Sequence, residues 1–262
     1  MIKALFTAAT GMQAQELNIN VIANNMANVN TTGYKKDRTE FQDLLYQTIA
    51  EPGASTSEST RSPSGIQIGL GVKTAATKKV FSQGDLTSTS NQLDMAIEGD
   101  GFFEIVLPDG STAYSRAGAF QLDENGQVVT SDGFALQPSI TIPSDAQSIS
   151  IGQDGIVSVL QPGSPTPSQV GTLQLTRFQN TAGLKAIGKN LYVETQSSGS
   201  PTQGTAGQDG YGRIAQGFLE SSNVSIVEEV VTMITAQKAY EANSKSVTTA
   251  DEMATNAINM KR

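Results

Sequence analysis

The sequence contains no cysteine, no histidine and no tryptophan, and aromatic residues make up only 6% of it. Without cysteine, the chain has no disulfide and no thiolate for catalysis or metal binding. Without histidine, it lacks the side chain that most often acts as a general base and most often binds transition metals. The composition therefore favours no catalytic chemistry, and we expect no catalytic residue, no cofactor and no metal ion.

Long basic stretches and long apolar runs are also missing. The formal net charge is −8 and the basic residues stand in short groups, which argues against a nucleic-acid partner. No segment is long and apolar enough to span a membrane. The start of the chain is only weakly similar to a secretory signal peptide, because Thr7, Thr10 and Gln13 interrupt its apolar run. If the protein leaves the cytoplasm, we expect it to do so without a cleaved signal peptide.

The C-terminal segment from Ser222 to Arg262 contains no glycine or proline and predicts one long helix. Ser225 and Glu228 form the pattern of a capping box near its start, and Lys261 beside Arg262 suits the negative pole at its end. Apolar residues recur after four and then three positions, the spacing of a coiled-coil seam, with a few polar residues between them. The seam residues are Ile226, Val230, Met233, Tyr240, Val247, Ala254 and Ile258.

The N-terminal segment carries a matching seam that ends before Gly33, a residue suited to a left-handed helix stop. Burying about seven apolar side chains contributes on the order of 10–20 kcal/mol, whereas ordering the backbone costs about 1–2 kcal/mol per residue. One such helix is unstable alone, so we expect the helices to need other subunits; an ordinary two-helix cap is the alternative. The seam residues are Ile2, Leu5, Ala9, Met12, Ile19, Ala23 and Met26.

Small residues lie on both helical segments away from the seams. This distribution suits close contact with further helices. The residues are Ala4, Ala8, Ala14, Ala27, Ala236, Ala239, Ala242, Ala250 and Ala257.

Between the helical ends the pattern changes twice. After the polar turn Val29–Lys36, the segment from Phe41 to Thr48 predicts a short helix, and Glu51–Gly65 has the Ser, Thr, Pro and Gly content of a flexible loop or extended arm. From Ile66 onward, apolar residues alternate with polar ones, and turn signals such as Pro108-Asp109-Gly110 are frequent. These short strands predict an antiparallel β domain, sandwich or barrel-like, over about residues 70–215.

Several stretches carry part of a functional motif. Gly183–Asn190 resembles a phosphate-binding loop, but Asn190 stands where Ser or Thr is needed and a strand is predicted where a helix should follow. Gly99-Asp100-Gly101 lacks the third glycine of a dinucleotide site, and Asp123 with Asn125 fits a hairpin turn better than a calcium loop. Acid-base chemistry on a sugar would need two carboxylates placed close together in space. The candidates are Asp94, Glu98, Asp100 and Glu104, which we interpret more simply as solvated groups.

Both ends of the chain and its centre resemble one known family. The N-terminal stretch Ala4–Lys36 contains ANNMANVN followed by TGYK, and the C-terminal stretch Leu219–Met253 has a matching signature. Between them stand GDGFFEI, YSRAGAFQLDENGQVVTSDGFALQ and GKNLYVET. Over nearly the whole chain these stretches resemble the axial proteins of the bacterial flagellum, and within that family the subunits of the distal rod.

The resemblance implies an α+β protein in which the long terminal helices form a coiled-coil-like assembly domain and line a hollow helical tube. We expect residues 1–33 and 219–262 to form this domain, residues 34–70 and 205–218 to connect, and residues 71–204 to form the central antiparallel all-β domain. An Asn-rich turn would lead the chain from inner helix to outer domain. Its residues are Asn24, Asn25, Asn28, Asn30 and Gly33.

The insertion Tyr46–Val72 resembles the extra segment that separates distal rod proteins from hook proteins. The resemblance implies that this segment stiffens a straight rod. The insertion residues that we single out are Tyr46, Pro52, Gly53, Pro63 and Gly65.

The resemblance also implies a function. It predicts a structural subunit of a rigid shaft that transmits torque, is exported by the flagellar export apparatus and stands in the cell-envelope part of the basal body. The implied partners are further copies of the chain, proximal rod proteins, the hook protein and surrounding ring proteins. The alternatives are a hook or proximal rod protein and, in a different class, a β module that binds wall carbohydrate.

Overall fold

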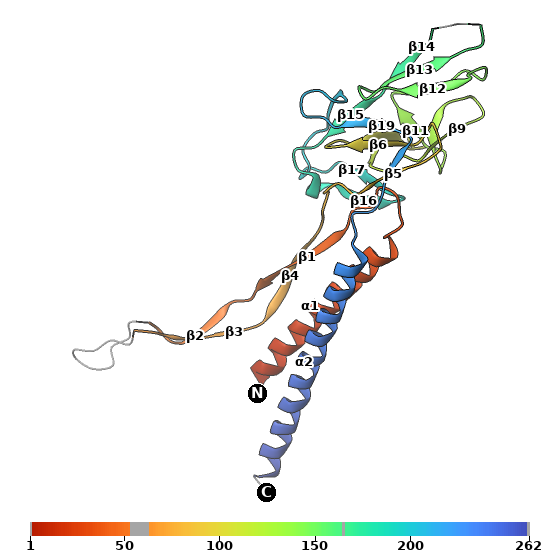
Figure 1. Ribbon diagram of the computed structural model, residues 1–262. Coiled ribbons are helices and arrows are strands. Elements are labelled where there is room, and N and C mark those ends of the chain that lie inside the picture. Colours follow the sequence, from red (N-terminus) through yellow and green to blue (C-terminus); the bar gives the residue numbers. More distant parts are fainter. Residues whose placement is uncertain (1, 53–62, 164–165, 261–262) are drawn as a thin grey trace. The chain divides into compact units, whose positions relative to one another are not determined.

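A computed structural model describes residues 2–52, 63–163 and 166–260 (Figure 1). A helix at each end of the chain and an antiparallel β region between them confirm the expected α+β layout. The chain divides into two compact units, which we call the helical unit and the β unit. The helical unit comprises Met1–Ala27, Asp37–Lys78 and Ser225–Arg262, and the β unit comprises Asn28–Lys36 and Lys79–Val224.

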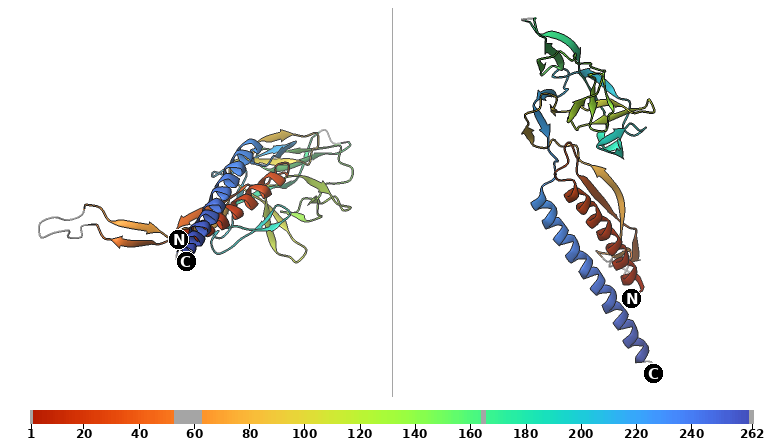
Figure 2. Two further views of the ribbon diagram at one scale, coloured as in Figure 1. Left: turned by 90° about the horizontal axis from the view of Figure 1, so that it is seen from below. Right: turned by 90° about the vertical axis from the view of Figure 1, so that its right-hand side faces the viewer.

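The helical unit joins the two ends of the chain. Helix α1 (Ile2–Ala27) and helix α2 (Ile226–Asn259) lie side by side and run antiparallel, as Figures 1 and 2 show. Ser225 is the N-cap residue of α2, but its side chain makes no capping hydrogen bond, so that half of the predicted capping box does not form. Glu228 and Glu229 still place negative charge in the first turn, where the helix dipole favours it.

Two pairs of strands complete the helical unit. Strand β1 (Asp37–Asp43) pairs with β4 (Val72–Lys79), and β2 (Tyr46–Ala50) pairs with β3 (Ile66–Gly69). The prediction of a short helix from Phe41 to Thr48 was therefore wrong. This segment is extended because its hydrogen-bonding partners, β3 and β4, stand further along the chain, and spacing within the segment does not reveal such partners.

The β unit contains a seven-stranded sheet with the strand order β16-β17-β8-β7-β11-β10-β9. Its pairings are antiparallel, and most join strands that are close in sequence. The strands are β7 (Phe103–Val106), β8 (Thr112–Ser115), β9 (Phe120–Leu122), β10 (Val128–Thr130), β11 (Ala135–Gln137), β16 (Lys185–Gly188) and β17 (Leu191–Val193).

Smaller antiparallel sheets complete the β unit. They are β12 (Ser148–Ile151), β13 (Ile156–Leu160) and β14 (Ser168–Thr172) in one sheet, and the pairs β15 (Gln174–Arg177) with β18 (Thr202–Thr205), β6 (Met95–Glu98) with β19 (Arg213–Gln216), and β5 (Leu86–Ser88) with β20 (Phe218–Glu220).

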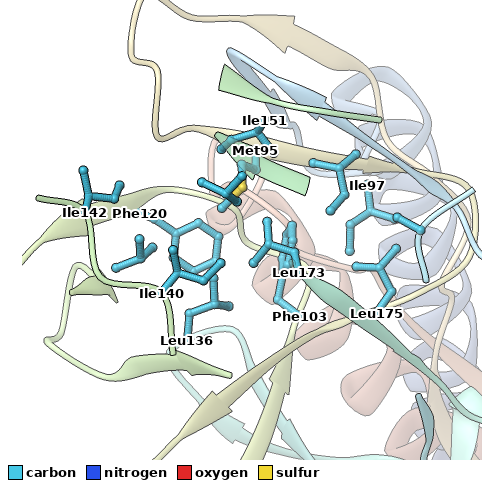
Figure 3. Packing of buried hydrophobic residues seen from close by; sticks show 14 of the residues in the cluster. Met95, Ile97, Phe103, Phe120, Leu136, Ile140, Ile142, Ile151, Leu173 and Leu175 are labelled. Carbon is cyan, nitrogen blue, oxygen red and sulfur yellow. The ribbon is translucent and has the colours of Figure 1, made fainter. Parts of the chain in front are cut away.

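The main core lies within the β unit, where inward-facing residues of many strands meet (Figure 3). Phe103 and Phe120 pack edge to face, with ring centroids 5.2 Å apart. Met95, Leu136 and Leu175 are buried in the same cluster. Successive side chains of a strand point to opposite faces of the sheet, so alternating apolar residues all lie on the face that meets the core. The period-two pattern predicted a β domain here for this reason.

The predicted turns form by local hydrogen bonds. Gly110 N donates to Leu107 O at 2.9 Å. Asp123 Oδ1 accepts from the backbone N of Asn125 at 2.9 Å, so the partial calcium motif is a hairpin turn, as the sequence predicted. The end of the partial phosphate-binding motif is also a turn, because Lys189 and Asn190 have φ values of 56° and 58° and connect β16 to β17.

A second cluster of the β unit is aromatic. Tyr114 packs edge to face on Phe178 with ring centroids 4.7 Å apart, and Phe102 and Tyr192 belong to the same cluster. Burial raises the pKa of the Tyr114 phenol to about 12, with further contributions from the negative charges of Glu104 and Glu194.

The raised pKa of Tyr114 predicts alkaline destabilisation. Above pH 10 the unfolded chain loses this proton before the folded chain does, so the free energy of unfolding should fall as pH rises towards 12. After a discount for screening by solvent, the loss is about 2 kcal/mol. In Tyr114→Phe this contribution should be absent. Urea unfolding of both proteins across this pH range measures the difference, and equal pH slopes would contradict the assignment.

Candidate assembly surface

Small residues set the contact between α1 and α2. Gly11 lies against Asn243, since a Cβ added to Gly11 would stand 2.7 Å from the Asn243 amide nitrogen. Near the other end of the pair, Asn25 Nδ2 donates to Glu229 Oε2 at 3.4 Å. In each pair the two residue numbers add up to the same sum. This is expected when two antiparallel helices keep one register along their length. Buried residues of the two helices include Ala8, Ala14 and Ile22 of α1 and Ala236 and Ala250 of α2.

The structure places the predicted seam residues at different depths. Ile2 belongs to α1, but its side chain is not described. The half-buried members are Leu5, Ala9, Met12, Ile19, Met26, Met233, Val247 and Ala254, and the exposed members are Ala23, Ile226, Val230, Tyr240 and Ile258. Their role in assembly stays a prediction.

The spacing of the seams did not predict which small residues of the two helices are buried. The sequence suggested Ala8, Ala14, Ala236 and Ala250 for contact with further helices, but they are buried within one chain. Small side chains let two helices approach closely, and Ile22 is a larger apolar residue that is buried with them. The spacing of small residues was the available signal.

Large apolar side chains remain exposed in the helical unit. They begin in the first turn of α2 and also occupy both strands of the β2–β3 hairpin. Exposed apolar area of this extent is typical of a surface that another protein covers. The residues are Phe6, Phe41, Leu45, Tyr46, Ile49, Ile66, Ile68, Ile226, Val227, Val230, Val231, Ile234, Tyr240, Met253, Ile258 and Met260.

Asn25 is the predicted connector residue that ties helix to strand in the helical unit. Its side chain bonds both backbone groups of Asp37: Nδ2 donates to Asp37 O, and Asp37 N donates to Oδ1, each at 2.9 Å. Asn25 thereby joins the last turn of α1 to the first residue of β1. Of the other asparagines, Asn24 and Asn30 are exposed, and Asn28 Oδ1 accepts from a neighbouring threonine hydroxyl at 3.2 Å.

Gly33 lies in the β unit, where it is buried with φ +70° and donates its N–H to Glu220 O at 2.8 Å. A Cβ there would stand 2.6 Å from the backbone N of Ala117. Helix α1 ends at Ala27, before Gly33 as expected, so Gly33 shapes the connecting turn and does not cap the helix.

A buried ion cluster in the β unit escaped the sequence analysis. Lys35 Nζ donates to Glu220 Oε1 at 2.6 Å, and Arg116 Nε donates to Glu220 Oε2 at 3.1 Å. The side chains of Lys35 and Glu220 are fully buried. Burial lowers the pKa of the Lys35 ammonium, while the Glu220 carboxylate opposes this shift. The sequence showed Lys35 only as part of a short basic group, because its partners lie far away in the chain.

The described insertion residues belong to the helical unit. Tyr46 begins β2 with an exposed side chain, and Pro52 and Pro63 are exposed. Gly65 is close to the Ala50 carbonyl oxygen, which would stand 2.5 Å from an added Cβ. The predicted positions that lie outside the described residues are Gly53, Lys261 and Arg262.

The candidate carboxylates have separate partners. Asp94 accepts from Thr89 Oγ1 at 2.7 Å, and Glu104 accepts from Gln203 Nε2 at 2.6 Å. Within the described ranges, no group of three or more acidic side chains is placed to hold a metal ion. The helices described for this chain also lack the combined length and apolarity needed to cross a membrane.

Comparison with protein families gives three matches along the chain. Residues 5–35 match the flagella basal body rod protein family, residues 96–159 match the D1 domain of flagellar hook proteins FlgE/F/G, and residues 215–260 match the C-terminal family of flagellar basal body rod FlgEFG proteins. These ranges contain most of both helices, the cluster residues Lys35 and Glu220, and much of the seven-stranded sheet.

Individual relatives are similar over the full length. The flagellar basal-body rod protein FlgG of Borreliella burgdorferi is 52% identical over 264 residues, covering 100% of both chains. FlgG of Caulobacter vibrioides is 50% identical, with 96% of this chain and 97% of the relative covered. The flagellar hook-basal body complex protein FlhP of Bacillus subtilis is 27% identical, with 97% of both chains covered.

The buried ion cluster predicts a large loss of stability in Glu220→Gln. The change leaves Lys35 and Arg116 buried without a neutralising charge, so the free energy of unfolding should fall by about 3–5 kcal/mol. The exposed pair of Lys189 with Asp132 provides a control, because Asp132→Asn should cost less than about 1 kcal/mol. Urea unfolding followed by tyrosine fluorescence compares them; equal losses would contradict the analysis.

The close approach at Gly33 predicts that Gly33→Ala costs more than its backbone conformation alone. Gly110 is a matched control, since its φ is +81° but no atom lies within 4 Å of an added Cβ. Gly110→Ala should lose about 1–2 kcal/mol from the left-handed conformation, and Gly33→Ala should lose more because Ala117 must also move. Thermal unfolding of both variants tests the order, and a smaller loss at Gly33 would refute it.

Proposed function

The chain belongs to the FlgG family of flagellar basal-body rod proteins, and from this premise we propose how it acts as a structural subunit of the distal rod. Copies of the chain polymerise through their helical units into a hollow, rigid helical shaft. The shaft transmits torque from the motor to the hook. No step of this function requires catalysis, and the relatives are rod proteins.

The observation that carries the proposal is the exposed apolar surface of the helical unit. Although α1 and α2 lie side by side, the large apolar side chains at the start of α2 remain exposed. Burial of about 25 cal/mol per Å² favours covering them, and neighbouring copies supply matching surfaces at every step of a polymer. The predicted seams would then form a coiled-coil-like inner layer.

The remaining parts of the proposal concern partners and location. Proximal rod proteins would join one end of the polymer, the hook protein the other, and ring proteins would surround it in the cell envelope. The flagellar export apparatus would deliver the chain without a cleaved signal peptide. A hook or proximal rod protein and a carbohydrate-binding module are less favoured alternatives, because the full-length relatives at about half identity are FlgG proteins.

Assembly through the helical unit predicts that protection of α1 and α2 depends on the polymer. In the purified chain, limited proteolysis should remove both ends and leave the β unit, and circular dichroism should show less helix than α1 and α2 together contain. In isolated basal bodies the same protease should leave both helices intact, because neighbouring copies cover them.

The opposite result is equally informative. A purified chain that resists the protease and already shows its full helix content would have a self-contained helix pair. The helices would then cap a single subunit, and polymerisation through the helical unit would be refuted.

A further inference from the structure

An apolar groove lies in the helical unit between the start of α1 and the bend that joins its two strand pairs. The groove has a volume of about 350 Å³ and is lined by Lys3, Phe6, Leu44, Leu45 and Leu70. Phe6 is 67% exposed and Leu45 is 83% exposed. Its lining is almost wholly apolar, so a small polar ligand would find few groups to bind, whereas apolar side chains would fit.

The end of α2 carries exposed apolar side chains. The antiparallel register places Glu252 opposite the start of α1 at Ile2, so α2 continues past its partner helix by roughly 10 Å. In both views of Figure 2 the C-terminal end of α2 lies near the start of α1, and one view shows α2 extending beyond it. Met253 is 52% exposed and Met260 is 84% exposed. Met260 is the C-cap residue of α2 and keeps helical backbone angles, so its spacing of seven residues from Met253 places both methionines near one face of the helix.

The groove and the end of α2 cannot meet within one chain. Phe6 stands two residues before Ala8, which places it nearly opposite the buried face of α1 that meets α2. A straight helix α2 would have to break and cross α1 to reach the groove. Any contact between these two surfaces therefore joins two copies of the chain.

One pair of charges beside the two surfaces, Lys3 and Glu252, is complementary. Lys3 Nζ at the groove donates to the side-chain amide of Gln47, a neutral partner that leaves the positive charge of Lys3 uncancelled. Glu252, next to Met253, is exposed and negative. Opposite charges at the edge of an apolar contact favour one pairing and one orientation over others.

We propose that the groove of one copy receives Met253 and Met260 at the end of α2 of a second copy. Methionine is flexible and fills irregular apolar grooves well. The contact joins two different surfaces, and such head-to-tail contacts generate open helical polymers. The proposal rests on the proposed function and names the contact that the polymer uses.

The absence of native cysteine makes cross-linking a direct test. Full-length Leu45→Cys and Met260→Cys would be co-expressed in cells that lack the native gene, and isolated rods would be treated with a short bismaleimide. We expect a cross-linked dimer that contains one copy of each variant. A matched control pairs Leu45→Cys with Val227→Cys, which is also exposed but lies at the other end of α2.

The outcomes separate this inference from the proposed function. If neither the variants nor the wild-type chain form rods, the proposed function fails and this inference fails with it. If rods form but the Leu45 and Met260 variants do not cross-link, or the Val227 control cross-links instead, the groove has another occupant and the inference alone is overturned.

A charge exchange tests the same contact without cysteine. Lys3→Glu and Glu252→Lys should each raise the chain concentration needed for polymerisation by about two- to fivefold. The double variant should return to near the wild-type concentration, because opposite charges again face each other across the contact. A double variant that assembles no better than either single variant would overturn the inference.

Discussion

The β unit depends on the buried carboxylate of Glu220, because this charge must be paired with residues near the points where the chain enters and leaves the unit. A buried charge is tolerated only when it is paired and hydrogen-bonded. One carboxylate oxygen of Glu220 pairs with Lys35, and the other pairs with Arg116. Lys35 follows α1 in the chain, and Glu220 precedes α2. One ion cluster therefore holds together the two segments that continue into the terminal helices.

Packing in the helical unit follows a different rule. Gly11 and the buried alanines let α1 and α2 approach closely, and the buried pair of Asn25 with Glu229 keeps their register. Large apolar side chains at the start of α2, such as Val227 and Val231, remain exposed beside this contact. The helix pair thus leaves an exposed apolar surface that other subunits could cover. This surface connects the packing of one chain to the proposed polymer.

Sequence reasoning succeeded where the physics is local and failed where distant residues compete. The turns at Gly110 and at Asp123 were predictable because each is closed by groups a few residues apart. The segment from Phe41 to Thr48 was mistaken for a helix, since its spacing suits a helix but its backbone pairs with β3 and β4, which stand further along the chain. The ion cluster was invisible because charge along the chain does not show which residues meet.

By itself the sequence determined the terminal helices, the short antiparallel strands and the turns, because periodicity and turn chemistry act over a few residues. It also carried the family resemblance, which the full-length relatives bear out. Only the tertiary structure decided which face of each helix is buried, how far α2 runs past α1, and that Lys35, Arg116 and Glu220 share one site. These features depend on contacts between residues far apart in the chain, and no local pattern records them.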